Sequence, residues 1–401
     1  MTDPRFLQIH FLASYTGALL NRDDAGLAKR LPFGAATRTR ISSQCLKRHW
    51  RMADDPRGIH RLAKAKGVES KRSKEVIERR VTAGLRGSHA DDIVDTVEKG
   101  FIIALYGKKG IDKKSRQALL LGVSEIEWLT ENARRIVAEA KDVEAAQEAV
   151  DALFGTTNAK ANLRELVAGN ALAAGLESAL FGRMVTSDPR ANTDAAIHVA
   201  HAFTVHAEQP ELDYFTVVDD LTGRSEDNED GDSGAAGVFD TELTSGLYYG
   251  YVVVDVPLLV SNLTGVRRAR WNAGDTDRSL AARVVENLVH LIATISPGAK
   301  RGSTAPYGFG EALLLEAGNR QPRTLANAFR EPVSLREPDS TLASRTATRL
   351  HQELAEIDAM YGDGELRLLA AKPGFVFEGP KRLTLPELAK RAGQLVLDAG
   401  A

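Results

Sequence analysis

One long interruption constrains the fold of this chain more than any other feature. Residues 59–183 contain no proline and are rich in Ala, Leu, Glu, Lys and Arg. Apolar residues recur in this stretch at helical spacing, as at Ala133, Ile136, Val137 and Ala140. Segments with the pattern of β-strands lie on both sides of it. The chain is therefore expected to contain an all-helical insertion, over 59–183, within a fold built on a sheet.

The flanking segments carry the strand signals. Residues 5–13 alternate between two faces, which predicts a buried strand. Residues 247–256 (LYYGYVVVDV) are aromatic and β-branched, which favours a central strand, and residues 307–316 predict another. Residues 277–294 predict a helix, since the stretch starts at an Asp and ends near a Pro-Gly pair. The part after residue 344 is expected to be helical.

The order of these elements indicates the fold class. Strand, helix, helical insertion, strand, helix and strand follow one another along the chain. This order predicts an α+β fold, a sandwich of the RRM or ferredoxin-like type that is interrupted by insertions.

A short helix predicted over 42–52 has two different faces. Ser42 or Ser43 is positioned to cap its N-terminus. Its polar face offers amides, hydroxyls and cations that could converge on a phosphate track, and a solvated amphipathic helix would have the same spacing. Cys45, Leu46, His49 and Trp50 form the face expected to pack, and Gln44, Lys47, Arg48 and Arg51 form the opposite face.

Charge is segregated along the chain, although the totals nearly balance at 52 Lys plus Arg against 54 Asp plus Glu. Residues 27–80 hold 16 Lys or Arg and 5 Asp or Glu, whereas residues 208–242 hold 12 acids and one base, Arg224. The basic stretch has the density expected of a protein that binds a phosphate backbone, and solvated helical faces can reach similar counts.

Two further segments carry candidate binding residues. Residues 208–245 alternate and then reach an acidic, glycine-rich tip at 225–237, which predicts a protruding hairpin. On it, Tyr214 and Phe215 are candidates for stacking on bases, unless one of them packs against the strand beneath. The loop SPGAKRG, at 296–302, places two basic residues, Lys300 and Arg301, between glycines, where a backbone can approach a phosphate closely.

Motifs for cofactors and metals are weak. No Walker A loop is present, and Gly308 with Gly310 lacks the third glycine of a dinucleotide motif, so no nucleotide cofactor is expected. On a helix only two of His198, His201 and His206 would share a side, and no carboxylate stands at metal-ligand spacing. Structural or surface roles are therefore expected for these histidines.

Two other groups of side chains could in principle bind a metal ion or act as a nucleophile. Asp23 and Asp24 could hold a divalent ion, or could form a loop turn or pair with Arg22. A serine nucleophile beside His49 is not expected, because His49 falls on the packing face of its helix.

The remaining sequence signals concern location. Cys45 is the single cysteine, so no internal disulfide is possible. No targeting signal or membrane span is expected. A cytoplasmic location is expected.

The run LNRDDAGLAKRLPFGAATRTRISSQCLKRHWR, at 19–51, resembles the N-terminal signature of the CasC family, the Cas7-type backbone subunit of the type I-E CRISPR Cascade complex. Three more stretches agree in order: FGRMVTSD at 181–188, DAAIHVAHAFTVH with DYFTVVDDL within 194–221, and SPGAK with LANAF within 296–329. The resemblance therefore extends over most of the chain.

The resemblance implies a hand-shaped subunit of the RAMP superfamily. It implies an RRM-like palm (1–58, 184–207, and 246–401 with a C-terminal helical region), helical fingers (59–183) and a β-hairpin thumb (208–245). Members of the family polymerise along a CRISPR RNA, and each thumb flips out a base so that the segments between can pair with target DNA. The implied partners are that RNA, target DNA, copies of the chain, other Cascade subunits and a recruited nuclease-helicase, with no cofactor and no catalysis.

The family's RNA-contacting positions map onto residues in several segments of this chain. Met184 would lie near the kinked base, and a Tyr replaces the Trp of the family's thumb pair. The resemblance thus assigns RNA contacts to Arg22, Lys29, Ser42, Gln44, Lys47, Arg51, Met184, Tyr214, Phe215, Lys300 and Arg301.

Two questions stay open at this stage. Related type III backbone subunits cut RNA with a loop Asp, so a metal-dependent endoribonuclease that uses Asp23 or Asp24 is the alternative function. The acidic tip at 225–237 has no counterpart in the family. It is expected to be a spacer or a docking patch for a neighbour's basic fingers.

Overall fold

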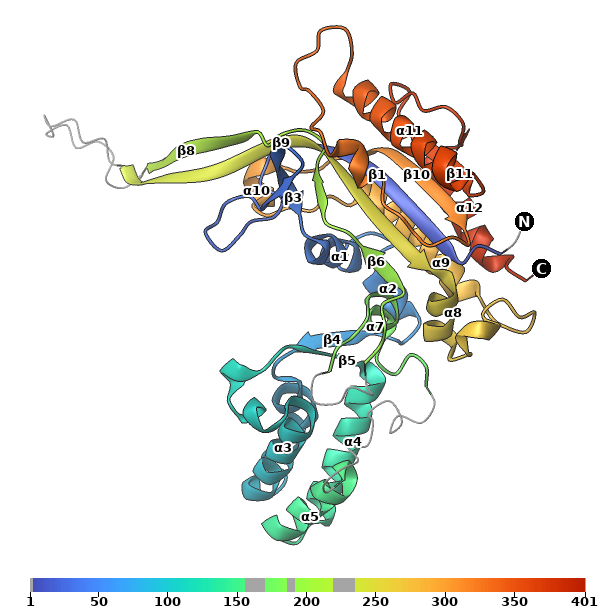
Figure 1. The fold of residues 1–401 in the computed structure, drawn as a ribbon. Helices are drawn as coiled ribbons and strands as arrows, with labels where there is room; N and C mark the ends of the chain where they lie inside the picture. The colour runs from blue at the N-terminus through green and yellow to red at the C-terminus, as the bar shows by residue number, and fades with distance from the viewer. Residues whose placement is uncertain (1–2, 156–169, 186–191, 219–234, 401) are drawn as a thin grey trace, which may run out of the picture.

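A large, mostly antiparallel sheet forms the main body of the protein (Figure 1). The computed structural model describes residues 3–155, 170–185, 192–218 and 235–400. The strand order is β12-β11-β10-β1-β9-β7-β3-β2, and β6 and β8 also pair with β9. The strands are β1 (Phe6–Ala18), β2 (Arg30–Phe33), β3 (Ala36–Ile41), β6 (Ile197–Val199), β7 (Ala202–Thr204), β8 (Pro210–Val218), β9 (Ala235–Asp255), β10 (Gly310–Gly318), β11 (Leu366–Ala371) and β12 (Lys381–Arg382).

The strands expected from the sequence lie at the centre of this sheet. β1 pairs with β9 on one side and with β10 on the other, and both pairings are antiparallel. The predicted strand over 5–13 is confirmed and continues to Ala18. The strand predicted over 247–256 is confirmed as the central part of a much longer β9. The mixed α and β class with a large sheet is therefore confirmed.

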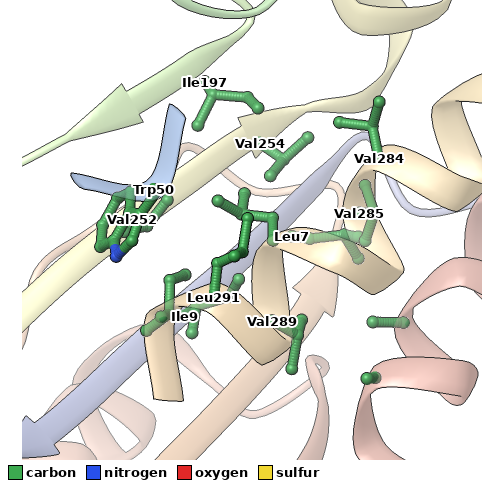
Figure 2. Packing of buried hydrophobic residues seen from close by; sticks show 14 of the residues in the cluster. Leu7, Ile9, Trp50, Ile197, Val252, Val254, Val284, Val285, Val289 and Leu291 are labelled. Atoms are coloured by element: carbon green, nitrogen blue, oxygen red, sulfur yellow. The ribbon is translucent and has the colours of Figure 1, made fainter. Parts of the chain in front are cut away.

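Helices α1 (Ser43–Arg51), α9 (Ser279–Thr294) and α12 (Leu385–Leu397) cover one face of the sheet. Figure 2 shows Val285 and Leu291 of α9 packed against Leu7 and Ile9 of β1. Trp50 of α1 is 1% exposed, and its ring centroid lies 6.4 Å from that of Phe11 in an edge-on contact. The helices predicted near 42–52 and 277–294 are therefore confirmed, and the first buries Leu46 and Trp50 of the face expected to pack.

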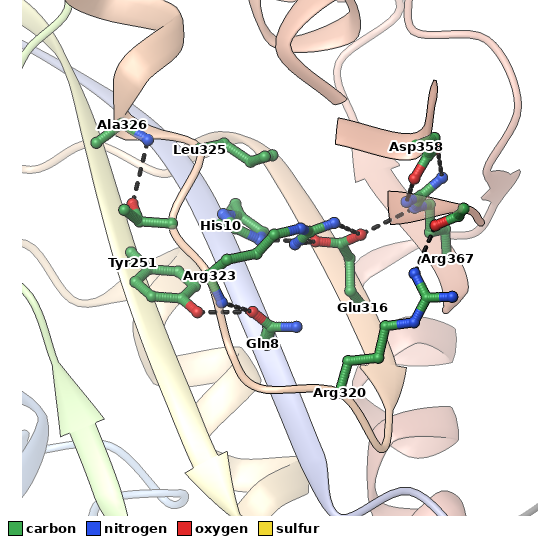
Figure 3. Close-up of polar contacts among 12 residues, drawn as sticks. Gln8, His10, Tyr251, Glu316, Arg320, Arg323, Leu325, Ala326, Asp358 and Arg367 are labelled. Carbon is green, nitrogen blue, oxygen red and sulfur yellow. Dashed lines mark hydrogen bonds and ion pairs between the residues drawn. The ribbon is translucent and has the colours of Figure 1, made fainter. Parts of the chain in front are cut away.

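The other face is covered by η7 (Ala326–Phe329) and α11 (Leu342–Tyr361). A buried ionic network crosses this face (Figure 3). Its centre is Glu316 of β10, whose side chain is 0% exposed and accepts hydrogen bonds from Arg323 (2.5 Å) and Arg367 (2.8 Å). His10 of β1 lies 3.1 Å from the same carboxylate. A buried carboxylate is tolerated there because it is fully paired.

The prediction of a wholly helical C-terminal part was wrong. After α11, the chain adds the strands β11 and β12 before it ends in α12. The reason is that β11 has the sequence LRLLAA, in which Leu and Ala are good helix formers. Its place in the sheet comes from pairing with β10, which local preference does not encode.

A second body hangs below the sheet in Figure 1 and has its own core. The long helices α3 (Asp91–Tyr106), α4 (Val123–Glu139) and α5 (Val143–Phe154) enclose that core, with Phe101 and Leu129 at its centre. The all-helical prediction was wrong in one respect, because β4 (Ser70–Ser73) pairs with β5 (Leu119–Gly122). Such four-residue strands are too short to show a period of two.

Shorter elements join the two bodies and complete the chain. Helices α2 (Ile59–Ala65) and α7 (Leu176–Phe181) pack into the core under the main sheet, although they lie at the two ends of the second body. Among the described helices, none combines the length and the apolar composition needed to cross a bilayer. The remaining helices are η1 (Ile77–Val81), η2 (Ala83–Leu85), η3 (Lys108–Ile111), η4 (Lys113–Ser115), α8 (Val256–Thr264), η6 (Arg268–Arg270) and α10 (Arg301–Thr304).

Strands β8 and β9 form an arm that extends far beyond the sheet (Figure 1). Their antiparallel pairing runs from Pro210 opposite Thr244 to Val218 opposite Ala235. This confirms an extended hairpin in the region where the sequence predicted one. The acidic tip predicted at 225–237 lies outside the described residues up to residue 234.

Candidate nucleic-acid interface

The start of helix α1 is fixed by two hydrogen bonds. The Ser42 hydroxyl accepts from the backbone N–H of Cys45 at 3.3 Å, so Ser42 is the N-cap. The backbone N–H of Ser42 donates to the side chain of Asn21 at 2.9 Å, which ties the helix to the preceding loop. Ser42 itself is 7% exposed. The hydroxyl that this helix end presents to a ligand is therefore that of Ser43, which is partly exposed.

The polar face of α1 divides into an open half and an engaged half. Gln44 and Arg48 are exposed. The Lys47 ammonium lies 5.7 Å from the centre of the Phe181 ring, and burial lowers its pKa. Arg51 Nε lies 3.2 Å from a carboxylate oxygen of Glu177 on α7. Two of the four predicted polar side chains on this helix thus face solvent, while the other two lean against α7.

Burial disfavours the charged forms of both Arg51 and Glu177. Burial lowers the pKa of Arg51, and Glu177 opposes that shift. Burial raises the pKa of Glu177, and Arg51 opposes it in turn. Burial outweighs the mutual attraction at both groups, so Arg51 cannot be treated as a free surface cation.

The loop before β2 is closed on itself. Lys29 donates its backbone N–H to Asn21 O at 2.9 Å, and Asp23 donates its own to Leu27 O at 2.8 Å. The Asp23 carboxylate accepts from the backbone of Ala25 (2.9 Å) and of Leu27 (3.0 Å). Asp23 therefore forms the turn that the sequence offered as one of its two roles. The neighbouring side chains of Arg22 and Asp24 are exposed.

A second loop, at 296–309, is bound to the first loop and to α1. Ala299 donates its backbone N–H to Leu19 O at 2.9 Å, and Gly298 donates to His49 Nε2 at 3.3 Å. Lys300 adopts a left-handed backbone conformation, with φ of 49°. That conformation costs a non-glycine residue roughly 1 kcal/mol. It turns the Lys300 side chain toward the hairpin, where its ammonium donates to the hydroxyl of Thr241.

The base of the hairpin is gripped on both of its faces. Thr241 and Glu242 are adjacent on β9, so their side chains point to opposite sides. On one side lies Lys300. On the other, Glu242 is 4% exposed, accepts from the backbone N–H of Ala28 at 2.6 Å and forms an ion pair with Arg30. The two loops that carry predicted RNA-contacting residues are therefore bonded to opposite faces of the hairpin base.

The aromatic pair on the hairpin is split between its two faces. Tyr214 and Phe215 are adjacent on β8 and are 68% and 42% exposed. The Phe215 ring lies on the side of Lys300, with 5.9 Å between the ring centre and the ammonium nitrogen. The sequence left open whether one of the two packs inward. The structure turns Phe215 toward the 296–309 loop and leaves Tyr214 on the other side.

Three cations gather around Cys45. Burial raises the pKa of the Cys45 thiol to about 11, and Lys29, Arg301 and Arg48 each oppose that rise by their charge. These cations come from the first loop, the second loop and α1. Folding therefore brings Arg301, from a distant part of the chain, near enough to act on the same thiol as Lys29 and Arg48, and such a concentration of positive charge suits phosphate binding.

Met184 lies apart from this cluster and is 74% exposed. Its neighbours Arg183 and Val185 are 5% and 2% exposed, so the chain is held firmly on both sides of it. An apolar side chain that projects from a fixed backbone can contact a base face.

The three histidines do not lie on a helix. His198 belongs to β6, and His201 lies just before β7. His206 is 1% exposed, and its Nε2 accepts from the backbone N–H of Leu247 at 3.2 Å. Within the described part of the chain, no three His, Cys, Asp or Glu side chains are grouped as metal ligands would be.

The sequence reasoning missed one feature of this region. Tyr307 and Phe309 are 75% and 71% exposed, on the segment that leads into β10. A strand was expected over 307–316, whereas β10 begins at Gly310. The available signal was the pair of aromatic residues on either side of Gly308, next to the basic loop.

Comparisons with known proteins place this geometry in context. A family model described as CT1975-like protein matches residues 7–390. A chain of a "CRISPR RNA-guided surveillance complex, pre-nicking" has a TM-score of 0.74 at 23% identity, over 98% of this chain and 100% of that one. A chain of another "CRISPR RNA-guided surveillance complex" has a TM-score of 0.64 at 20% identity, over 97% and 99%. A search of curated proteins found no match. The fold is thus shared over nearly the whole chain.

Proposed function

Because the chain belongs to the CT1975-like protein family, we propose that it is a Cas7-type backbone subunit that binds CRISPR RNA within a type I-E Cascade surveillance complex. In this proposal the main sheet is an RRM-like palm, the body around α3, α4 and α5 forms the fingers, and the β8–β9 hairpin is the thumb. The observation that carries the proposal is the grip on the hairpin base, because it joins the hairpin to both basic loops.

The described residues suit the binding of an RNA backbone without reading its sequence. Lys29, Arg48 and Arg301 supply the positive charge. The N-terminus of α1, with its backbone amides, would favour a phosphate at the Ser43 end. Such contacts hold phosphates and leave the bases free, so sequence would be read by pairing between the guide and target DNA. The exposed Tyr214 and Met184 would flank the base that the thumb displaces.

The proposal describes a scaffold without catalytic activity of its own. Its partners would be copies of the same chain along the guide, other Cascade subunits and a recruited nuclease-helicase, in the cytoplasm. The structural role of Asp23 supports this choice over a metal-dependent endoribonuclease. Two backbone amides already occupy one oxygen of its carboxylate, and that arrangement shapes the loop that bears Arg22 and Lys29.

The proposal is tested by purifying the tagged chain from its native host and sequencing the RNA that comes with it. We expect short RNAs of uniform length with repeat-derived ends. A matched strain with Arg48→Glu and Arg301→Glu should yield much less RNA at equal protein, because both changes reverse charge on the proposed surface. Heterogeneous cellular RNA, or none, from the unaltered chain would contradict the proposal.

A further inference from the structure

Two exposed aromatic side chains remain without a role in the surface described so far. Tyr307 and Phe309 are among the most exposed large apolar side chains in the described residues, at 75% and 71%. Single exposed apolar residues are common, but here two rings flank one glycine. Neither belongs to the core clusters of the main body. Folding therefore does not account for their size.

The segment that carries these rings is held rigidly. The Ser296 hydroxyl bonds to both the N–H and the C=O of Gly308, each at 2.9 Å, which closes the loop at its two ends. A Cβ at Gly308 would lie 2.9 Å from the backbone oxygen of Ser14 on β1, so only glycine fits there. Rings that project from a fixed backbone lose little conformational entropy when a ligand covers them.

The same loop joins these rings to the basic surface. Arg301 lies on it and acts by its charge on Cys45 and His49 of α1. Gly298 is bonded to His49, and Pro306 packs beside Gly298. The aromatic segment is thus one side of a small loop whose other side carries two cations, Lys300 and Arg301.

We infer that Tyr307 and Phe309 form a second aromatic platform, which stacks on nucleobases of the bound single-stranded RNA. The inference rests on the proposed function and extends it by a contact site outside the hairpin. Proteins that hold single strands combine cations along the backbone with aromatic faces for the bases, and both are present on this loop. The adjacent positive charge favours a polyanion as the occupant over a second copy of the chain.

The test compares two probes that have equal numbers of phosphates. One is a fluorescent oligouridylate, and the other is an abasic oligonucleotide of the same length. The unaltered chain should bind the oligouridylate more tightly. In the double variant Tyr307→Ala and Phe309→Ala, this advantage should fall about tenfold. The dependence of affinity on salt should stay the same, since no phosphate contact is lost.

Three matched variants make the result specific. Tyr361→Ala removes a ring that is 65% exposed at the end of α11, on the other face of the sheet, and should leave the advantage unchanged. The exchange Tyr307→Phe with Phe309→Tyr keeps both rings and should retain it. Repeating the double variant in a Tyr214→Ala and Phe215→Ala background separates the contribution of Tyr307 and Phe309 to the affinity from that of the aromatic pair on the hairpin.

The outcomes distinguish this inference from the function on which it rests. If the unaltered chain binds the oligouridylate but the double variant keeps the whole advantage, the platform is refuted and RNA binding stands. If the double variant keeps its RNA affinity but loses self-association by light scattering, the rings form a protein contact and the inference is again refuted. If the unaltered chain binds neither probe, the proposed function fails, and the inference fails with it.

Discussion

The ammonium of Lys300 lies 5.9 Å from the centre of the Phe215 ring, although the two residues belong to separate segments of the chain. The Lys300 ammonium also donates a hydrogen bond to the hydroxyl of Thr241. Thr241 lies on β9, which pairs with β8, the strand of Phe215. On the opposite side of the hairpin, Arg30 pairs with Glu242 and Glu208. Both loops are therefore bonded to the hairpin, so a substitution in either contact should loosen the hairpin.

Glu242→Ala should loosen the hairpin base. Glu242 is 4% exposed, and the change removes the acceptor of the Ala28 backbone N–H and one of the two carboxylates that pair with Arg30, so that Arg30 keeps only Glu208. An unsatisfied buried group costs about 1–3 kcal/mol, so unfolding by denaturant should occur at a lower concentration, and protease should cut residues 208–245 faster. Asp240→Ala is the control, since Asp240 lies on the same face but is exposed. Equal effects of the two changes would contradict a role of Glu242 in holding the hairpin base.

Lys300→Ala and Arg301→Ala should separate two functions of one loop. Both changes should weaken RNA binding, and each should reduce the slope of log affinity against log salt by roughly one. Only Lys300→Ala should also increase proteolysis of the hairpin, because Arg301 makes no described contact with it. Identical protease patterns for the two variants would refute the link between Lys300 and the hairpin.

Arg51→Ala should lower the free energy of unfolding by more than it weakens the free energy of RNA binding. It leaves Glu177 largely buried without its partner, at a cost of up to about 3 kcal/mol. Adding Glu177→Gln should restore most of the loss in a double-mutant cycle. Arg48→Ala, on the open side of α1, should show the reverse pattern, with weaker RNA binding and unchanged stability.

The pH dependence of Arg51→Ala provides a second check. Burial raises the pKa of Glu177 above its ordinary value of 4.5, so the folded state holds the proton more tightly than the unfolded state. Without Arg51 this upward shift should grow. The variant should therefore gain stability relative to the unaltered chain as the pH is lowered from 7 toward 4.5, as measured by chemical unfolding.

The network around Glu316 should make the protein sensitive to acid. Burial would raise the pKa of Glu316, but hydrogen bonds from Arg323 and His10 outweigh it and hold the pKa far below the ordinary 4.5. Burial lowers the pKa of His10 from 6.5. Both groups bind protons more readily in the unfolded chain, so stability should fall as the pH drops below 6.5 and more steeply below 4.5.

Glu316→Gln should flatten the lower part of that acid limb and cost about 3 kcal/mol at neutral pH, since two arginines lose their buried partner. Asp275→Asn is the matched control, because it breaks an ion pair with Arg270 whose side chains are 62% and 71% exposed. That change should alter the unfolding free energy by less than about 1 kcal/mol. An unchanged acid limb in Glu316→Gln would show that other groups control acid unfolding.

Asp23 and Asp24 provide the test of catalysis. With Mg²⁺ and RNA complementary to the guide, the assembled complex should leave that RNA intact. Asp23→Ala should weaken guide binding by disordering the loop, whereas Asp24→Ala should have little effect because Asp24 is exposed and Asp23 forms the turn. Periodic cleavage of the RNA that either change abolishes would instead establish the endoribonuclease alternative.

Features of this protein that depend on neighbouring residues can be predicted from its sequence. The alternation in β1, the two faces of α1 with Ser42 as its cap, the two ends of α9 and the extended hairpin are all visible as local patterns. Such patterns can be read because period and capping depend on residues a few positions apart. The segregation of charge along the chain is also a property of the sequence alone.

Contacts between distant residues, in contrast, depend on the packing of the whole chain. This packing brought Lys300 to Thr241 and Glu242 to Arg30, set Arg51 against Glu177, and left Tyr307 and Phe309 exposed. It also paired the short strands β4 and β5, which show no period of their own. The physical reason is that these contacts join segments far apart in the chain. Their geometry is fixed by the packing of the sheet and its helices, and neither partner carries a local signal of the other.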